Sequence, residues 1–398
     1  MFLLKHWKNL STLHLSRENL CKKQYCNVTK TNRFVLKILE KLNHFVLKVR
    51  TGGFADSIIG CEDSEPESKP DSTDPPLIEY HYELPVVFHV LYQNEQQNIK
   101  KGRIQEIITA CNKYYQNRLG SNSVDMNLEF VLATENPQGV KLDEPGVHPI
   151  QVSNPVQDCE VFMTDKANLK YLWDTDKYIN IMLYPFKQDE NSEGVILGIS
   201  HLPYTIKPDY LEGLNQLNGI PSHSSLKYPH CISINNTYIN STPSNESKKI
   251  YSSTDIVATI AHELAHYLGL FHTFSESDDE GLNTCMDTDY CDDTPTYDRE
   301  AYSNWMQSYI ESKNGIKNMS LSEFNKLFER KDCVTNLTST PNNIMDYDIS
   351  WVNRFTPNQQ ERIRYVLMHS PLVPGPKVER TTTRTLSGEQ ELPMRMIK

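Results

Sequence analysis

Three histidines, one glutamate and one glycine between residues 262 and 272 could together bind a metal ion and use it. His262 and His266 are four residues apart, so on a helix they share one face and can ligate the same ion. Glu263 follows the first histidine and can reach a water bound to that ion. Gly269 can adopt a positive φ and end the helix, which lets the chain turn His272 back as a third ligand. Three protein ligands leave a fourth coordination position for water, as in a catalytic zinc site.

The residues around this motif predict a buried helix, here called the zinc helix. Ser253, Thr254 and Asp255 can cap its first turn through their side-chain oxygens. An apolar surface follows at helical spacing and consists of Ile256, Val257, Ile260, Ala261, Leu264 and Leu268. A packed helix holds ligands more rigidly than a loop does. The alternative is a solvated helix face that binds no metal.

Further segments resemble the metzincin clan of zinc endopeptidases, and within it the pappalysin and cytophagalysin family of ulilysin-like peptidases. The histidine motif fits the clan signature, and residues 343–347, Asn-Ile-Met-Asp-Tyr, resemble its Met-turn. The segments that resemble the family are Leu84–Val90, His272–Phe274, Asp293–Pro295 and Arg354–Gln359. The resemblance covers residues 80–370 and implies an α+β, metzincin-like fold. Its parts are a mixed twisted sheet with helices in an upper subdomain, the zinc helix, and an irregular lower subdomain with a C-terminal helix.

The resemblance also implies an activity, that of a zinc-dependent endopeptidase acting on protein or peptide substrates. His262, His266 and His272 are the implied zinc ligands. Glu263 is the implied general base, which takes a proton from a zinc-bound water. We expect substrates to be the chain's main partners.

Two residues of the Met-turn receive roles through the same resemblance. Met345 is implied to form an apolar floor below the zinc ion. Tyr347 is implied to donate a hydrogen bond to the oxyanion of the tetrahedral intermediate, or to approach the metal when substrate is absent. A structural tyrosine in a tight turn is the alternative. Residues 194–200 are the candidate edge strand that pairs with an extended peptide, with an interior strand as the alternative.

Two other classes of function remain open. One is a surface-anchored binding or adhesion protein with a structural zinc ion, and the other is a zinc hydrolase that acts on a non-peptide bond. Structural zinc usually has four protein ligands, and Glu263 would then have no role, which disfavours the first class.

Charge and composition divide the 398 residues into regions. Residues 1–60 carry 11 Lys and Arg against 3 Asp and Glu, although the whole chain has a net charge of −11. This basic segment is either an export region or the result of a start site placed too far upstream. Residues 61–78 are acidic and rich in Ser and Pro, which predicts a linker. Residues 79–372 are the predicted catalytic domain, divided at residue 272, and residues 373–398 a disordered tail. The acidic domain excludes nucleic acid as a partner.

Residues 57–61, Ser-Ile-Ile-Gly-Cys, resemble a bacterial lipoprotein processing box, although the preceding sequence is a poor secretory signal. Cys61 is therefore either acylated or an ordinary thiol, and as a thiolate it could instead block the zinc in a proform. We expect a monomer that is secreted or at the cell surface, with a lipid anchor to the outer membrane if Cys61 is acylated. Contact with the membrane is expected only through this residue.

Nine cysteines fit an exported protein whose irregular lower subdomain is cross-linked. The resemblance implies a disulfide between Cys285 and Cys333, with Cys291 to Cys333 as the competitor. Buried thiols are expected at Cys111, Cys159 and Cys231.

Residues 287–294 contain four aspartates, which could bind a cation. A solvated acidic loop is the first interpretation, and calcium at Asp289 and Thr294 is the second.

The remaining patterns predict strands and helices around the motif. Alternating or β-branched segments predict strands at residues 82–92, 128–133, 178–184, 195–201 and 231–238. Helical spacing predicts helices at residues 104–119 and 357–368, the second beginning with a capping box from Thr356 to Gln359.

Overall fold

The computed structural model describes residues 79–95, 98–188, 195–222, 225–240, 255–275, 285–347, 350–379, 385–386 and 394–397. The predictions for the basic segment, the linker and Cys61 lie outside the described residues. Among the helices in these ranges, none is long and apolar enough to cross a membrane.

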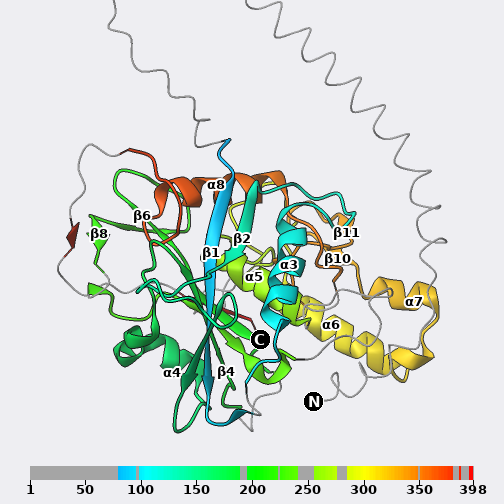
Figure 1. Cartoon of the computed structure of the whole chain (residues 1–398). Coiled ribbons are helices and arrows are strands. Elements are labelled where there is room, and N and C mark those ends of the chain that lie inside the picture. The colour runs from blue at the N-terminus through cyan, green and yellow to red at the C-terminus, as the bar shows by residue number, and fades with distance from the viewer. Residues whose placement is uncertain are drawn as a thin grey trace, which may run out of the picture. The chain divides into compact units, whose positions relative to one another are not determined.

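A mixed sheet forms the centre of the fold (Figure 1). In the described part of the chain it has seven strands, in the order β13, β5, β9, β4, β1 and β2, with β3 also paired to β1. The strands are β1 (Tyr82–Tyr92), β2 (Leu128–Leu132), β3 (Val147–Gln151), β4 (Ile179–Tyr184), β5 (Gly198–His201), β9 (Ile232–Asn235) and β13 (Met394–Ile397). Neighbouring strands from β2 to β9 are parallel, whereas β5 is antiparallel to β9 and β13 is antiparallel to β5. The predicted α+β class with a mixed sheet is confirmed.

Alternate side chains of the strands enter two different cores. In β4, Ile181 and Leu183 join the cluster that includes α3 (Arg103–Tyr115) and α5 (Ile256–Tyr267). The intervening Met182 and Tyr184 join a second cluster with α4 (Cys159–Thr164). This period of two is that of a strand covered on both faces. The sheet therefore supports α5, the zinc helix, on one face.

Polar contacts of α3 fix the zinc helix relative to the sheet. The hydroxyl of Tyr115 donates a hydrogen bond to the carbonyl oxygen of Ala261 in α5, at 2.7 Å. The side chain of Asn112 bonds both main-chain polar groups of Phe130 in β2, at 2.8 and 2.9 Å. Buried polar groups are costly unless paired, so these bonds fix the relative position of α3, β2 and α5.

Most predicted elements are present, with shifted ends. The predicted strands correspond to β1, β2, β4, β5 and β9, and the predicted helix 104–119 is α3, which ends at Tyr115. The predicted C-terminal helix is α8 (Pro357–His369), and the capping box from Thr356 to Gln359 is present.

The region after the zinc helix contains more helix than predicted. α6 (Arg299–Ser312) and α7 (Leu321–Lys326) lie in the stretch expected to be irregular. α6 buries only Tyr302 and Met306, so its apolar spacing is too sparse to give a helical signal in the sequence. The prediction of an irregular lower subdomain was wrong for these two helices.

The prediction of a disordered tail was also wrong for two segments. β12 (Thr385–Leu386) pairs with β8 (Ile220–Pro221), and β13 pairs with β5. Polar and charged residues surround both segments in the sequence, so the strands depend on main-chain pairing with distant parts of the chain. The other short elements are β6 (Tyr204–Ile206), β7 (Asn215–Leu217), β10 (Arg330–Lys331), β11 (Thr338–Ser339) and the 3₁₀ helices η3 (Lys166–Tyr171), η5 (Asn236–Tyr238) and η7 (Ile316–Asn318).

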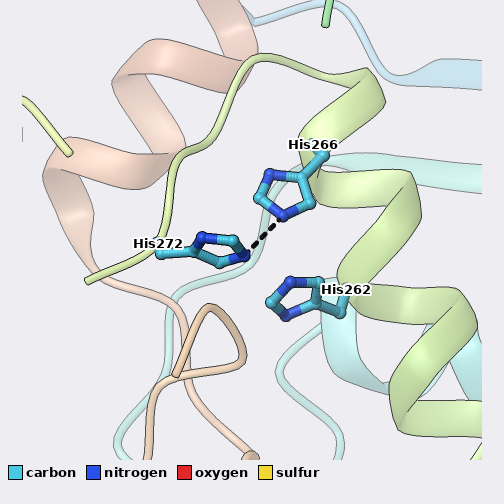
Figure 2. Close-up of side chains that lie close together, drawn as sticks. All are labelled: His262, His266 and His272. Carbon is cyan, nitrogen blue, oxygen red and sulfur yellow. Dashed lines mark hydrogen bonds between the residues drawn. The ribbon is translucent and has the colours of Figure 1, made fainter. Parts of the chain in front are cut away.

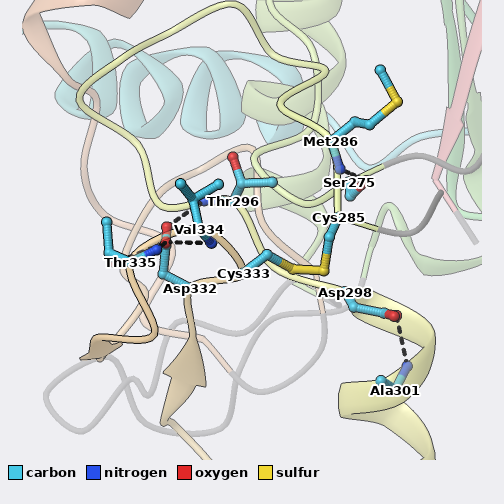
Figure 3. Close-up of a disulfide and its surroundings, with 10 residues drawn as sticks. All are labelled: Ser275, Cys285, Met286, Thr296, Asp298, Ala301, Asp332, Cys333, Val334 and Thr335. Carbon is cyan, nitrogen blue, oxygen red and sulfur yellow. Dashed lines mark hydrogen bonds between the residues drawn. A yellow bond between two sulfur atoms is a disulfide. The ribbon is translucent and has the colours of Figure 1, made fainter.

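A disulfide joins Cys285 to Cys333, as expected from the family resemblance (Figure 3). The two cysteines are 48 positions apart, and closing a loop of that length in the unfolded chain stabilises the fold by about 4 kcal/mol in the chain-entropy description. Cys291, the competing partner, is a buried free thiol. The buried thiols predicted at Cys111, Cys159 and Cys231 are confirmed.

Candidate metal centre

The zinc helix begins at a side-chain cap and is buried along its whole length. The carboxylate of Asp255 accepts hydrogen bonds from the main-chain nitrogens of Val257 and Ala258, at 2.8 and 3.4 Å. All twelve residues of α5 are buried. Burial on every side restricts the side-chain rotamers, so the two histidines of α5 have defined directions.

The zinc helix ends at Gly269, which has a φ of 92°. The Gly269 nitrogen donates to the His266 carbonyl oxygen at 2.9 Å, and the Leu270 nitrogen donates to that of Ala265 at 3.0 Å. These two bonds form a Schellman motif, in which a left-handed residue reverses the chain. A Cβ at position 269 would also lie 2.7 Å from Val366 Cγ2 of α8. The glycine therefore permits both the turn toward His272 and close packing against α8.

The three histidines converge, as the sequence predicts (Figure 2). One ring nitrogen from each of His262, His266 and His272 lies within 4.8 Å of the other two, and all three side chains are buried. The Nδ1 atom of His262 donates to the Ile344 carbonyl oxygen, and that of His266 to the Leu270 carbonyl oxygen, both at 2.7 Å. Because a carbonyl oxygen only accepts, each bond places the proton on Nδ1 and leaves Nε2 with a lone pair.

This arrangement of donor atoms fits a zinc ion. Nε2 of His266 lies 3.0 Å from Nε2 of His272, so a lone pair on the first nitrogen points at the second ring. Neutral imidazole nitrogens are common zinc ligands, and a carbonyl bonded to the other ring nitrogen is the usual support for such a ligand. His262, His266 and His272 would hold the ion. Within the described ranges, no other group of three or more His, Cys, Asp or Glu residues has metal-binding geometry.

Glu263 lies beside the triad in an unusual environment for a carboxylate. It is fully buried, and neither of its oxygens has a hydrogen-bond partner among the described residues. Burial raises the pKa of the Glu263 carboxyl well above its ordinary value. A nearby dication would favour the charged form and oppose this shift. The carboxylate is thus available to a water or substrate that enters the centre.

Gly198 of β5 contacts this carboxylate, and no pattern in the sequence indicates this contact. A Cβ at position 198 would lie 2.6 Å from Oε1 of Glu263. Only a glycine lets the strand come this close to the general-base candidate. The strand predicted at residues 194–200, described from residue 195, therefore borders the metal centre. It is not the edge strand that was predicted, because β5 pairs with β9 on one side and with β13 on the other.

The Met-turn lies next to the third histidine. The nitrogen of Thr273 donates to the carbonyl oxygen of Met345 at 3.1 Å, immediately after His272. Met345 is fully buried, and its nitrogen donates to Oδ1 of Asn343 at 2.9 Å. The Asn343 side chain in turn exchanges two hydrogen bonds with Gln359 of α8, at 2.9 and 3.0 Å. This chain of bonds couples α8 to the metal centre.

The ring of Tyr347 completes one wall of the site. Its centroid lies 4.6 Å from that of His272 and 5.6 Å from that of His262. Arg299 of α6 stacks over the Tyr347 ring, with its Cζ atom 4.4 Å from the ring centroid. The centroid of the Phe274 ring lies 4.9 Å from that of Tyr347. The structure thus brings Tyr347 together with the histidines, as predicted, and adds Arg299, whose spacing in the sequence carries no signal.

A buried ionic cluster supports the same turn. Arg330 is fully buried, and its Nη2 atom lies 4.0 Å from Oδ2 of Asp346 and donates to the Tyr347 carbonyl oxygen at 3.4 Å. The Tyr297 hydroxyl donates to Oδ1 of Asp346, and the Arg330 guanidinium lies 3.5 Å from the centroid of the Tyr302 ring. Removing one partner would leave a buried charge uncompensated, so the cluster holds the turn in one geometry.

The second cation site predicted at Asp289 and Thr294 has its oxygens engaged by the chain. The Thr294 hydroxyl donates to Oδ2 of Asp289 at 2.6 Å, and the Cys291 nitrogen donates to Oδ1 at 3.0 Å. Burial raises the pKa of Asp289 to about 7. Calcium binding here stays a prediction.

Comparisons with known proteins found similar solved structures and one family model. Among solved structures, mature mirolysin from Tannerella forsythia in complex with a cleaved peptide is 24% identical, with a TM-score of 0.48, over 72% of this chain and 91% of that one. A promirolysin mutant from Tannerella forsythia is 22% identical, with a TM-score of 0.48, over 74% of this chain and 84% of that one. No match was found among curated proteins.

A peptidase family model described as pregnancy-associated plasma protein-A matches residues 231–368. This segment contains the zinc helix, His272, the Met-turn and α8. The part of the chain that builds the metal centre is therefore similar to this peptidase family.

Proposed function

We propose that the protein is a zinc-dependent endopeptidase in which Glu263 is the general base. The observation that carries the proposal is the buried, unpartnered Glu263 carboxylate next to three converging imidazole nitrogens. A structural zinc site would give this carboxylate no role, and its burial would then be an uncompensated cost.

Each residue of the metal centre has a separate role in the proposed reaction. His262, His266 and His272 would hold the zinc ion, which would supply a Lewis acid for the scissile carbonyl and would lower the pKa of the attacking water. Glu263 accepts the proton of that water and then delivers it to the leaving amine. The Tyr347 hydroxyl donates a hydrogen bond to the oxyanion that develops on the carbonyl oxygen. The stacked Arg299 and the ring of Phe274 orient the Tyr347 phenol.

We also propose that the protein is exported, to the cell surface or the medium. The supporting observation is the disulfide from Cys285 to Cys333, because such bonds persist in oxidising compartments. The proposal includes acylation of Cys61, which would anchor the exported protein to the outer membrane.

Replacing the general base tests the mechanism directly. Glu263→Gln keeps the shape of the side chain and removes its basicity, so zinc content should stay at one ion per chain. The kcat/KM for casein or a quenched peptide should fall by roughly 10³-fold or more. Glu361→Gln, on the exposed face of α8, is the matched control and should keep full activity. A Glu263→Gln variant with undiminished activity would exclude this role.

Adding one methyl group to β5 tests the contact between the strand and the base. In Gly198→Ala, the new Cβ meets the side chain of Glu263, from Cγ to Oε1, and no main-chain atom, so the Tm should change by only a few degrees. The displaced carboxylate should nevertheless lower kcat by roughly 10-fold to 10²-fold. Ser200→Ala, two positions along the same strand, is the control. Wild-type kcat in Gly198→Ala would show that Glu263 does not act from its observed position.

Removing one hydroxyl tests Tyr347. Tyr347→Phe keeps the ring contacts with His272 and Arg299 and deletes the donor. We expect kcat to fall by roughly 10-fold to 10²-fold with KM nearly unchanged, because the lost bond forms in the transition state. Phe274→Leu, which alters the ring's packing and not the donor, is the comparison. Equal kcat for Tyr347→Phe and the wild type would leave the tyrosine with a structural role alone.

Alkylation of the protein taken from its native source tests export. Cys285 and Cys333 should resist alkylation until reduction, and intact mass will show whether Cys61 carries an acyl group. Modification of both cysteines without reduction would place the protein in a reducing compartment.

A further inference from the structure

The edge of the sheet beside the metal centre is covered by a segment from the far end of the sequence. β13 pairs antiparallel with β5 over four successive positions, from Met394 opposite His201 to Ile397 opposite Gly198. The other edge of β5 pairs with β9 inside the sheet. β13 therefore occupies the edge of β5 that the rest of the main sheet leaves open.

The covered edge belongs to the strand that contacts the general-base candidate. Gly198 lies against Oε1 of Glu263, and Ile397 is the residue paired with Gly198. Main-chain pairing at a strand edge binds extended peptides with little demand on their sequence. A peptide laid along β5 toward Glu263 would use the same main-chain groups as β13.

The segment before β13 is tied to the domain at several points. Val373 is fully buried, and the Tyr82 hydroxyl donates a hydrogen bond to the Pro376 carbonyl oxygen at 3.0 Å. The main-chain nitrogen of Val378 donates to the carbonyl oxygen of Met368 at 3.1 Å. β12 is then held by β8. β13 follows β12 closely in the chain, so it is presented to β5 at the effective concentration of a short tether, on the order of millimolar.

We propose that residues 394–397 act as a tethered, substrate-like strand that competes with peptide substrates for the edge of β5. This inference rests on the proposed peptidase function. In the closed arrangement β13 completes the sheet and excludes an extended peptide from the edge of β5, the strand whose Gly198 contacts Glu263. Displacement of β13 exposes the edge and opens the site. The chain thus contains its own competitive inhibitor, whose strength depends on main-chain hydrogen bonds.

The test removes those hydrogen bonds in the full chain. Along an antiparallel strand, the main-chain nitrogens of successive residues point alternately toward and away from the partner. The double variant Arg395→Pro with Met396→Pro therefore deletes at least one donor to β5, whichever residue faces it. The matched control is Arg395→Ala with Met396→Ala, which changes the same side chains and keeps both nitrogens.

The proline pair should raise kcat/KM for a short quenched peptide by roughly 3-fold to 10-fold, mainly by lowering KM. The alanine pair should match the wild type. A synthetic peptide of residues 387–398, added to the proline pair, should inhibit competitively and restore the lower kcat/KM. Intact mass confirms that the segment is uncleaved in each chain. Equal kcat/KM for wild type and the proline pair, or equal activation by the alanine pair, overturns the proposal.

A binding experiment separates this inference from the peptidase activity. If none of the chains cleaves peptides, the proposed function fails, and fluorescence anisotropy of the labelled 387–398 peptide then decides whether the strand docks. Binding to the proline-pair chain, lost when the peptide itself carries both prolines, supports docking on β5. Lack of binding at millimolar peptide overturns it.

Discussion

The hydrogen bond from Nδ1 of His262 to the carbonyl oxygen of Ile344 is the constraint on which the metal centre depends. It joins the zinc helix to the Met-turn across 82 positions of the chain. It also fixes the tautomer of His262, so that Nε2 is left to face the other two histidines. The bond from His266 to Leu270 has the same effect at the other end of the motif. Folding therefore determines which nitrogen of His262 and of His266 is available before any metal is present.

The turn that supplies this carbonyl oxygen is held from two directions. Gln359 of α8 fixes Asn343 at its start, and the ionic cluster of Arg330 and Asp346 fixes its end. The disulfide from Cys285 to Cys333 closes the segment that carries α6 and brings Arg299 to Tyr347. Residues far from the histidines in sequence are thus needed to keep the three imidazoles at metal-binding distance.

The features that could be predicted from the sequence are those whose physics is local. Helical spacing placed His262 and His266 on one face, and the need for a positive φ explained Gly269. The capping box at Thr356 located the start of α8 within one residue. Resemblance to a family, and not local physics, supplied Tyr347 and the disulfide from Cys285 to Cys333.

The features that escaped prediction depend on contacts between distant segments. α6 has little apolar periodicity because it is stabilised by two buried side chains and an N-cap. β13 has no strand signal of its own, since its order comes from pairing with β5. Arg330 and Gly198 have meaning only once the fold brings Asp346 and Glu263 beside them. Contacts between residues that are far apart in the sequence leave no pattern in any short segment of it.

The burial of three imidazoles and one carboxylate in the same core links metal loading to the stability of the whole domain. Without a cation the Glu263 carboxylate is desolvated with no hydrogen bond from the described residues, which lowers the free energy of unfolding. An ion that binds only the folded state raises the free energy of unfolding through its binding free energy. The metal concentration in the compartment where the chain folds therefore sets the fraction of the protein that stays folded as well as the fraction that is active.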